Sequence, residues 1–376
     1  MKKQYDVLIV GGGIIGHSIA YTLSKRGSSV LVLEKGEINE KASQRAAGML
    51  AAQGEVKEDG PLFQLARKSR NTFPALKDEL KEQSGIDIEL IEKGMLNVAM
   101  TDEKADELKE MILFQQSAGE DAIWLSAKEA NELEPGLSTN IIGAMYAPKD
   151  GQVSAPKLAH AFAKAASSLG ADIQEHTEVV KILSKQGKCV GVETACDTFL
   201  AEHVVVTTGA WTKQVLQSAG LTLPIYPVKG ECISVHSHRS IIEKTIFTDE
   251  CYVVPKCEGR FIIGATMVPN TFDEQVRVGS VTGLLNKAMN LVPFLKDTTW
   301  EKVWAGIRPQ TIDGLPFMGE HPMIQGLYVS TGHYRNGILL SPITGEIMAD
   351  MIHGVPNNQD ITAFSLHRAI KEVEQP

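Results

Sequence analysis

The sequence of 376 residues is 43% hydrophobic and 22% charged. A chain of this length exceeds the size at which one hydrophobic core keeps growing, so we expect two domains, and its composition excludes an intrinsically disordered protein. The net charge of -9 and the pI near 5.6, without a clustered run of Lys and Arg, argue against a nucleic-acid-binding surface.

Cysteine spacing and the length of the apolar runs give two further expectations. The five cysteines contain no CxxC pair, so the sequence predicts no metal site, and an odd number without a secretion signal indicates reduced thiols in the cytoplasm. The opening MKKQYDVLIVGGG begins like a signal peptide, but Asp6 interrupts the apolar run and favours a buried strand. No segment approaches the roughly 20 apolar residues of a membrane-spanning helix, so we expect no membrane partner.

The first part of the chain alternates between strands and helices. The pattern predicts a strand, a glycine turn, a helix and a second buried strand, at residues 6–10, 11–16, 14–25 and 30–33 respectively. The Ala- and Gly-rich segment 41–55 breaks this alternation. Residues 61–83 are predicted to be helical.

Capping and turn signals define the next elements. Residues 85–100 alternate as a β-hairpin would, and Thr101 and Ser126 each stand where a helix N-cap is expected. Ser126 forms a capping box with Glu129.

The second half of the chain is richer in strands. A helix capped by Ser154 is expected to end at Gly170, and three strand-like runs follow, of which the one containing residues 203–207 is apolar enough to be central in a sheet. Residues 225–304 alternate strongly, with one helix near 280–291. A last helix is expected to be capped by Ser341 and to begin at Pro342.

The glycine turn carries the first functional signal. Gly11, Gly13 and Gly16 satisfy GxGxxG between a strand and a helix, where they allow a tight turn, close approach of a diphosphate and close helix packing. Glu34 ends the second strand 18 residues after Gly16, where a carboxylate accepts both ribose hydroxyls. The sequence therefore predicts a dinucleotide with an unphosphorylated adenosine ribose.

The choice between NAD and FAD depends on the segment after Glu34. In an NAD dehydrogenase the alternation of strands and helices would continue to complete a doubly wound half. Here it breaks into KASQRAAGMLAAQGE, whose small residues let the backbone approach a bulky planar ring. This loop favours a flavin.

Several motifs together resemble the FAD-dependent D-amino-acid oxidase and sarcosine oxidase superfamily, and most closely the bacterial glycine oxidases of thiamine biosynthesis. The matching segments are VGGGIIG, AAGML, VVVTTGAWT, PVKGECISV, CYVVP, IIGATM, WAGIRPQTIDGLPFMG and TGHYRNGILLSP. The resemblance covers nearly the whole chain. It implies oxidation of a small amine by noncovalent FAD, reoxidation by oxygen to hydrogen peroxide, release of ammonia and glyoxylate, and a homotetramer.

We expect an α/β plus α+β fold, with a Rossmann-like FAD-binding domain and a second domain built on an antiparallel sheet. The FAD-binding domain is predicted to be discontinuous, at residues 1–85, 150–224 and 316–376, and the substrate-binding domain to comprise residues 86–149 and 225–315. The residues expected to contact FAD are Gly11, Gly13, Ile14, Ile15, Gly16, Glu34, Lys35, Ser43, Arg45, Ala46, Ala47, Gly48, Met49, Val179, Thr208, Gly209, Trp211, Arg335, Asn336, Gly337, Ile338 and Leu339.

The resemblance also implies the substrate-binding residues. Arg308 is expected to hold the substrate carboxylate, because a guanidinium fork does so better than an ammonium, and Tyr252 to donate its hydroxyl to the same group. Met267 would line the cavity, and the side chain of Arg335 would lie next to the substrate. Glu250 departs from the family pattern and is expected at the cavity entrance, and Arg45, where small residues are usual, points either to the diphosphate or to solvent. No side chain is expected to act as an obligate base, since the flavin performs the chemistry.

Other interpretations stay open on the sequence alone. Sarcosine oxidases bond FAD to a cysteine near the position of Arg308, but no cysteine follows Cys257 here. A D-amino-acid oxidase or a quinone-coupled dehydrogenase would share the glycine turn and the arginine. A flavin-dependent assembly factor without turnover would have no need of Arg308 and Tyr252 in one cavity.

Overall fold

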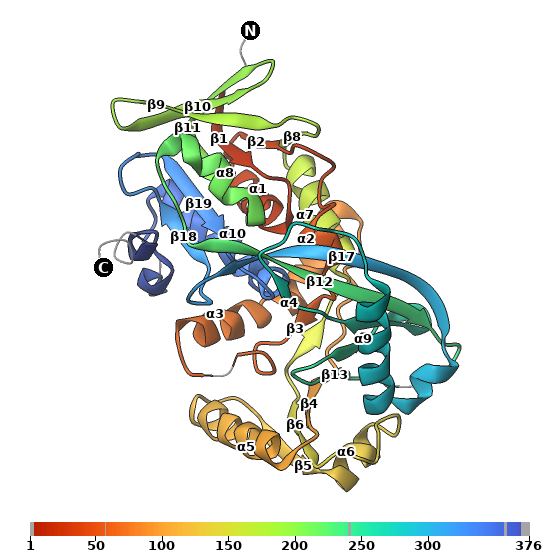
Figure 1. The fold of residues 1–376 in the computed structure, drawn as a ribbon. Helices are drawn as coiled ribbons and strands as arrows, with labels where there is room; N and C mark the ends of the chain where they lie inside the picture. The colour runs from red at the N-terminus through yellow and green to blue at the C-terminus, as the bar shows by residue number, and fades with distance from the viewer. Residues whose placement is uncertain (1–3, 57, 240–241, 357–358, 370–376) are drawn as a thin grey trace.

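The first of two large sheets has parallel strands at its centre and antiparallel strands along part of its margin. The computed structural model describes residues 4–56, 58–239, 242–356 and 359–369 (Figure 1). The sheet has eight strands, with the order β18-β19-β11-β1-β2-β8 and with β10 and β9 added beside β11. Their bounds are β1 Gln4–Val10, β2 Val30–Leu33, β8 Asp172–Gln174, β9 Val179–Lys185, β10 Lys188–Thr194, β11 Thr198–Val206, β18 Phe317–Glu320 and β19 Leu327–Thr331.

Apolar strands explain the parallel order at the centre of this sheet. β1 runs parallel to both β2 and β11, and β11 runs parallel to β19. All four residues of β2 are buried, as expected for a strand that is covered on both faces. The prediction that residues 203–207 belong to a central strand is confirmed, because β11 lies between β1 and β19.

Helices from three distant parts of the chain cover one face of the sheet. α1 (Ile14–Lys25) packs against both α7 (Ala155–Ser168) and α10 (Gly337–His353), and α10 packs against α3 (Pro61–Arg70). Figure 1 shows α1 and α10 beside this sheet. The carboxyl ends of β1 and β11 and the amino end of α1 thus meet at one edge, which is where ligands bind in such folds.

The second sheet has nine strands in the order β16-β12-β15-β14-β13-β4-β6-β5, with β17 paired to β12. Almost all of its pairs are antiparallel, which confirms the predicted fold class; β13 and β4 are the parallel exception. The bounds are β4 Met95–Ala99, β5 Ile123–Ser126, β6 Gly143–Ala147, β12 Ile225–His236, β13 Thr245–Phe247, β14 Tyr252–Pro255, β15 Arg260–Gly264, β16 Val268–Pro269 and β17 Thr299–Thr311.

The remaining elements flank the two sheets. A two-stranded pair joins β3 to β7, and most of the other helices are short. Their bounds are β3 Met49–Leu50, β7 Gly151–Gln152, α2 Ala42–Arg45, α4 Phe73–Ser84, α5 Asp102–Ser117, α6 Ala127–Leu133, α8 Thr212–Leu216, α9 Val278–Leu291, η1 Gly209–Trp211, η2 Gln217–Ala219, η3 Cys257–Gly259, η4 Pro293–Asp297 and η5 Thr362–Phe364. No helix within the described ranges is both long and apolar enough to cross a membrane.

The division of strands between the sheets bears on the predicted domains. Every strand of the first sheet falls within the ranges expected for the FAD-binding domain, and every strand of the second within those expected for the substrate-binding domain. The domain boundaries themselves stay a prediction.

The prediction that residues 61–83 are helical is confirmed except at Asn71 and Thr72, where the chain turns between two helices and Pro74 then lies in the first turn of α4. One prediction in the neighbouring segment was wrong. Residues 85–100 do not form a hairpin, since β4 pairs instead with β6 and β13 and so satisfies its backbone groups with distant strands.

The predicted start of the last helix was also wrong. α10 begins at Gly337 rather than at Pro342, which lies inside it. Pro342 has no N–H for the carbonyl of Ile338, but the Ser341 hydroxyl donates to that carbonyl at 2.9 Å. This replacement removes part of the cost of proline within the helix.

Candidate active site

The glycine turn has the backbone geometry that close approach of a diphosphate requires. Gly11 has a φ of +109°, and a Cβ there would lie 2.8 Å from the carbonyl oxygen of Thr207. A Cβ on Gly16 would overlap the carbonyl oxygen of Gly11, so helix and strand can pack this closely only with glycine. The Ser43 hydroxyl accepts from the Ile14 N–H at 2.9 Å and orients the start of α1.

Glu34 is anchored by the backbone on both of its carboxylate oxygens. Oε2 accepts from the Gly12 N–H at 2.7 Å and Oε1 from the Gly36 N–H at 2.9 Å. A carboxylate oxygen has two acceptor positions, so this anchoring leaves one on each oxygen for a ribose hydroxyl. Glycine turn, helix start and Glu34 therefore fit a dinucleotide such as FAD.

A cavity of about 70 Å³ lies between the second sheet, at β12, β14 and β17, and a wall formed by α2, β3 and the start of α10. Segments 45–49 and 334–338 form part of its wall, and the Trp304 indole N–H fixes the first segment by donating to the carbonyl of Arg45 at 2.9 Å. The lining residues are Ala42, Arg45, Ala46, Ala47, Gly48, Met49, Glu55, Gly230, Tyr252, Gly306, Arg308, Tyr334, Arg335 and Ile338. We call it the substrate cavity.

Arg308 presents its guanidinium to this cavity. It lies on β17 opposite Val228 of β12, and diagonally across from Gly230, on the same face of the sheet. Its Nη1 donates to the carbonyl of Thr266 at 3.4 Å. Within the part of the chain that the structure describes, no carboxylate pairs with Arg308, so its charge remains available for an anion.

Tyr252 is buried in the same wall, with 6% of its surface exposed. Its hydroxyl lies 3.5 Å from the sulfur of Cys232. Burial raises the pKa of Tyr252 well above its usual value, and Cys232 adds to the rise while Arg308 opposes it. The phenol is therefore protonated at neutral pH and serves as a hydrogen-bond donor.

Arg335 is held by an acid that the sequence did not single out. Its Nε donates to Glu55 Oε2 at 2.7 Å and its Nη2 to Glu55 Oε1 at 3.0 Å, while its guanidinium lies 5.4 Å from the ring centre of Phe247. Burial alone would lower the pKa of Arg335, but Glu55 raises it above the usual value. Arg335 and Glu55 thus form a neutral pair in the cavity wall, in contrast to Arg308.

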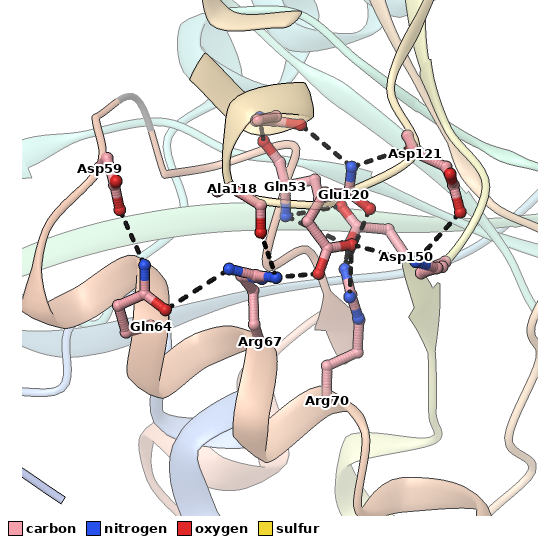
Figure 2. Close-up of polar contacts among 11 residues, drawn as sticks. Gln53, Asp59, Gln64, Arg67, Arg70, Ala118, Glu120, Asp121 and Asp150 are labelled. Carbon is pink, nitrogen blue, oxygen red and sulfur yellow. Dashed lines mark hydrogen bonds and ion pairs between the residues drawn. The ribbon is translucent and has the colours of Figure 1, made fainter. Parts of the chain in front are cut away.

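A buried polar network holds the turn that precedes Glu55 (Figure 2). The Asp150 carboxylate accepts from the backbone N–H groups of Gln53 and Gly54 at 2.8 to 3.2 Å, and Arg70 donates to Asp150 at 3.0 Å. Arg70 also pairs with Glu120 at 2.8 Å. Burial raises the pKa of Asp150 to about 6, against the lowering effect of Arg70 and the two N–H groups. The network fixes residues 53–54 and hence the position of Glu55.

The other predicted substrate residues lie further out. Met267 is 54% exposed, and its sulfur lies 3.5 Å from the hydroxyl of Tyr334, a cavity residue. Glu250 is exposed, pairs with Lys287 at 3.0 Å and does not line the substrate cavity. Arg45 packs its Cβ against Gly306, and its side chain lines the cavity.

The remaining predicted cofactor residues lie along the edge of the first sheet or in α10. Lys35 is exposed and pairs with Glu178 at 3.4 Å, Val179 is buried at the start of β9, and Trp211 packs against Phe272. Thr208, Gly209, Asn336, Gly337 and Leu339 stand after β11 or at the start of α10. Glu55, Gly230 and Tyr334 lie within the segments quoted from the sequence, but they were not singled out, because their partners lie far away in the sequence.

Together, the dinucleotide edge and a cavity with an unpaired guanidinium fit an oxidoreductase that acts with a dinucleotide on an anionic substrate. The chain belongs to the DAO family of FAD dependent oxidoreductases, whose model matches residues 6–351. The predicted enzyme class and FAD cofactor are thereby confirmed.

Similarity to named proteins and to a solved structure indicates which members of the family this chain resembles. The chain is 48% identical to "Glycine oxidase" of Geobacillus kaustophilus, over 99% of each chain. The crystal structure of glycine oxidase from the same organism superposes with a TM-score of 0.95, at 49% identity, over 96% of this chain and 98% of that one. "Bifunctional protein ThiO/ThiG" of Trichormus variabilis is 34% identical over 98% of this chain and 55% of its own length. The predicted resemblance to glycine oxidases is confirmed.

Proposed function

We propose that this protein is a glycine oxidase, which converts glycine, oxygen and water to glyoxylate, ammonia and hydrogen peroxide through an imine. The observation that carries the proposal is Arg308, which is unpaired by any acid in the described residues and stands beside the buried donor Tyr252. The similarity to named glycine oxidases supports the choice of substrate.

The protein's part in the reaction is to bind and orient the substrate. Arg308 holds the substrate carboxylate by a charge-assisted pair, and the Tyr252 hydroxyl donates to the same group. Noncovalently bound FAD would be held by the glycine turn, Glu34 and the segments 45–49 and 335–339, and it supplies a hydride acceptor that oxygen can reoxidise. Orientation of the substrate Cα–H bond is the chief catalytic contribution, and no side chain need act as an obligate base.

The cavity dimensions favour small substrates. A space of about 70 Å³ suits glycine, sarcosine and small D-amino acids better than bulky ones. Arg335, as a pair with Glu55, borders this space without offering a second free cation. Anaerobic titration of the flavin spectrum with each substrate will rank them.

The biological setting is proposed from resemblance. We infer a homotetramer in the cytoplasm, with oxygen as the electron acceptor and the imine product used for thiazole assembly in thiamine biosynthesis. The match to a bifunctional protein that includes ThiG supports the last of these inferences. The predicted domain ranges are proposed unchanged.

The clearest single test is the variant Arg308→Ala. Loss of a charge-assisted pair costs about 2 to 5 kcal/mol, so we expect the KM for glycine to rise at least about 30-fold. The visible flavin spectrum should show FAD still bound. Arg277→Ala, which removes a side chain that is 62% exposed, is the matched control and should leave the KM unchanged. An unaltered KM in Arg308→Ala would contradict the proposed role.

An anaerobic titration distinguishes the alternatives. Glycine, sarcosine and D-alanine are added separately to the oxidised holoprotein, and oxygen is then admitted. Bleaching by glycine followed by peroxide supports the proposal, whereas bleaching without peroxide indicates a dehydrogenase with another acceptor. A spectrum that none of the three changes would contradict the substrate class.

A further inference from the structure

A second cavity, of about 310 Å³, lies beside the substrate cavity and is lined mainly by polar and charged residues. Its lining includes none of the glycines of the turn, nor Glu34, Arg308 or Tyr252. The charged lining residues are Arg45, Glu89, Lys256, Glu258, Arg260 and Lys302, and we call this space the basic cavity.

The basic cavity occupies the same face of the second sheet as the substrate cavity. Ser234 of β12 pairs with Ile262 and with Lys302, and all three line the basic cavity. Gly230 lies on the same strand, four residues before Ser234, and lines the substrate cavity. Because alternate residues of a strand share a face, both cavities lie on one face and are separated by the segment 45–47, which lines both.

The charges around the basic cavity do not balance. Arg260 pairs with Glu301 at 3.0 Å, and Glu89 pairs with Lys157. Across the described residues, no ion pair engages Arg45, Lys256 or Lys302. Glu258 at the rim is exposed and opposes them with a single charge. Three cations therefore surround the cavity without their own counter-ions, in a chain whose net charge is -9.

Lys256 is partly buried, as is Arg45, whereas Lys302 is exposed. The ammonium of Lys256 donates to the carbonyl of Val153 at 2.9 Å, which leaves two of its three N–H groups without a partner in the described structure. Burial lowers the pKa of Lys256 to about 7, although Glu89 and Cys257 act in the opposite direction. An anion in the cavity would restore the full charge of this lysine by taking up a proton.

Two more features suit an anion with an organic part. The first turn of α7 reaches the cavity through Ser154, Ala155 and Pro156, and the positive end of the helix adds to the field of the cations. The ring of Trp304 supplies an apolar wall, and Lys302 lies 5.3 Å from its centre. The volume is at the lower end of the range of ligand pockets, about 300 to 1,000 Å³.

We propose that the basic cavity is a second binding site, which takes a small organic dianion with a phosphate or sulfate group. A monoanion such as a glycine carboxylate would leave most of the cationic charge unbalanced, whereas a dianion contacts two or three of the cations at once. The site uses neither Arg308 nor Tyr252, and it shares only the segment 45–47 with the substrate cavity.

Sulfate is the probe, because its charge does not change between about pH 6 and 9, so that any pH dependence comes from the protein. FAD-loaded protein is titrated calorimetrically with sodium sulfate, at an ionic strength held constant with sodium chloride. We expect saturable binding that is about tenfold weaker at pH 8.5 than at pH 6, because the protonated form of Lys256 binds the anion more tightly than the neutral form. The measured heat should also depend on the buffer, as proton uptake requires.

Variants assign the site. Lys256→Met should weaken sulfate binding about tenfold at pH 6 and remove its pH dependence, whereas Lys302→Met should weaken binding and keep the pH dependence. Lys296→Met, at an exposed lysine of η4 outside the cavity, is the matched control and should change neither. Phenyl phosphate should bind more tightly than sulfate if Trp304 contacts the organic part.

Four results would overturn the proposal. They are no saturable heat, a response that chloride reproduces, unchanged sulfate affinity in Lys256→Met, and a lower FAD content in that variant, which would assign the cavity to the flavin. Arg308→Ala separates the two proposals. This variant should retain sulfate binding, whatever its KM for glycine. If it loses sulfate binding, sulfate binds in the substrate cavity and not in the basic cavity.

Discussion

The guanidinium of Arg308 occupies the space that a side chain at position 230 would fill. A Cβ built on Gly230 overlaps Nη1, Nη2 and Cζ of Arg308. Since Gly230 lies within the paired strand β12, the backbone cannot easily move to make room. Gly230 is thus a positioning residue for the proposed carboxylate-binding arginine.

We therefore expect Gly230→Ala to displace Arg308 and weaken glycine binding. A loss of about 2 kcal/mol corresponds to a KM about 30-fold higher, with FAD still bound. Gly283→Ala is the matched control, because no atom lies within 4 Å of a Cβ there and alanine favours the helix α9 by about 0.5 to 1 kcal/mol. Steady-state kinetics of both variants with glycine are the measurement. Equal KM values for Gly230→Ala and the native protein would refute the positioning role.

Tyr252 has a similar relation to Gly264, where a Cβ would overlap the phenol ring. Tyr252→Phe keeps the ring and removes only the donor. We expect the lost hydrogen bond to cost about 1 to 2 kcal/mol, which lowers kcat/KM for glycine roughly 5- to 30-fold. Most of this change should appear as a higher KM. Tyr226→Phe, at a tyrosine that lines neither cavity, is the control. A fall in kcat alone would assign Tyr252 to the chemical step and contradict a role in binding.

The Glu55–Arg335 pair leads to a prediction about stability. Glu55→Gln leaves the Arg335 guanidinium in the cavity wall without its counter-ion, and we expect a loss of about 1 to 3 kcal/mol in the free energy of unfolding. The Glu55→Gln/Arg335→Gln double variant should recover part of that loss. Thermal melting of the four holoproteins forms a double-mutant cycle. Additive losses would show that the two side chains do not stabilise each other.

Local sequence signals sufficed for the dinucleotide half of the molecule. The apolar run of β1, the glycine turn and the start of α1 are neighbours in the sequence, and the predicted helix bounds, Ile14–Lys25, agree with the structure. The capping box at Ser126 was also predicted correctly, since it involves only Ser126 and Glu129. Such features follow from short-range hydrogen bonds and periodicity.

Long-range pairing explains what the sequence could not reveal. Gly230 meets Arg308 only because β12 and β17 pair in one register, and Glu55 meets Arg335 across a separation of 280 residues. Segment 85–100 alternates like a hairpin, but β4 is completed by β6 and β13. In each case tertiary contacts decided between arrangements that the local pattern permitted equally.

The buried polar network around Arg70 leads to a prediction about the stability of the protein (Figure 2). Arg70→Met removes the cation between Glu120 and Asp150, whose carboxylates are then buried close together. We expect the free energy of unfolding to fall by about 3 kcal/mol, with a smaller loss at pH 5 than at pH 8, because the uncompensated acids can then take up protons. Arg26→Met, at a partly exposed arginine with two acidic partners, is the control. A loss that is the same at both pH values would contradict this account.

Two buried histidines predict a loss of stability in mild acid. Burial lowers the pKa of His17 to about 4 and that of His333 to about 3, whereas an unfolded chain has a histidine pKa of about 6.5. Below pH 6.5 the unfolded state therefore binds more protons than the folded state, and each histidine lowers the stability by up to about 1.4 kcal/mol per pH unit. The effect of His17 levels off near pH 4.

His17→Gln should therefore flatten the dependence of the holoprotein's melting temperature on pH between about 6.5 and 4, even if it lowers the melting temperature at neutral pH. The comparison of slopes separates the titration of His17 from the loss of its contact with Asn39, which is 3.3 Å away. His367→Gln, at an exposed histidine, should keep the native slope. If the melting temperature of His17→Gln depends on pH as steeply as that of the native protein, His17 is not neutral in the folded state. The acid sensitivity must then come from other groups.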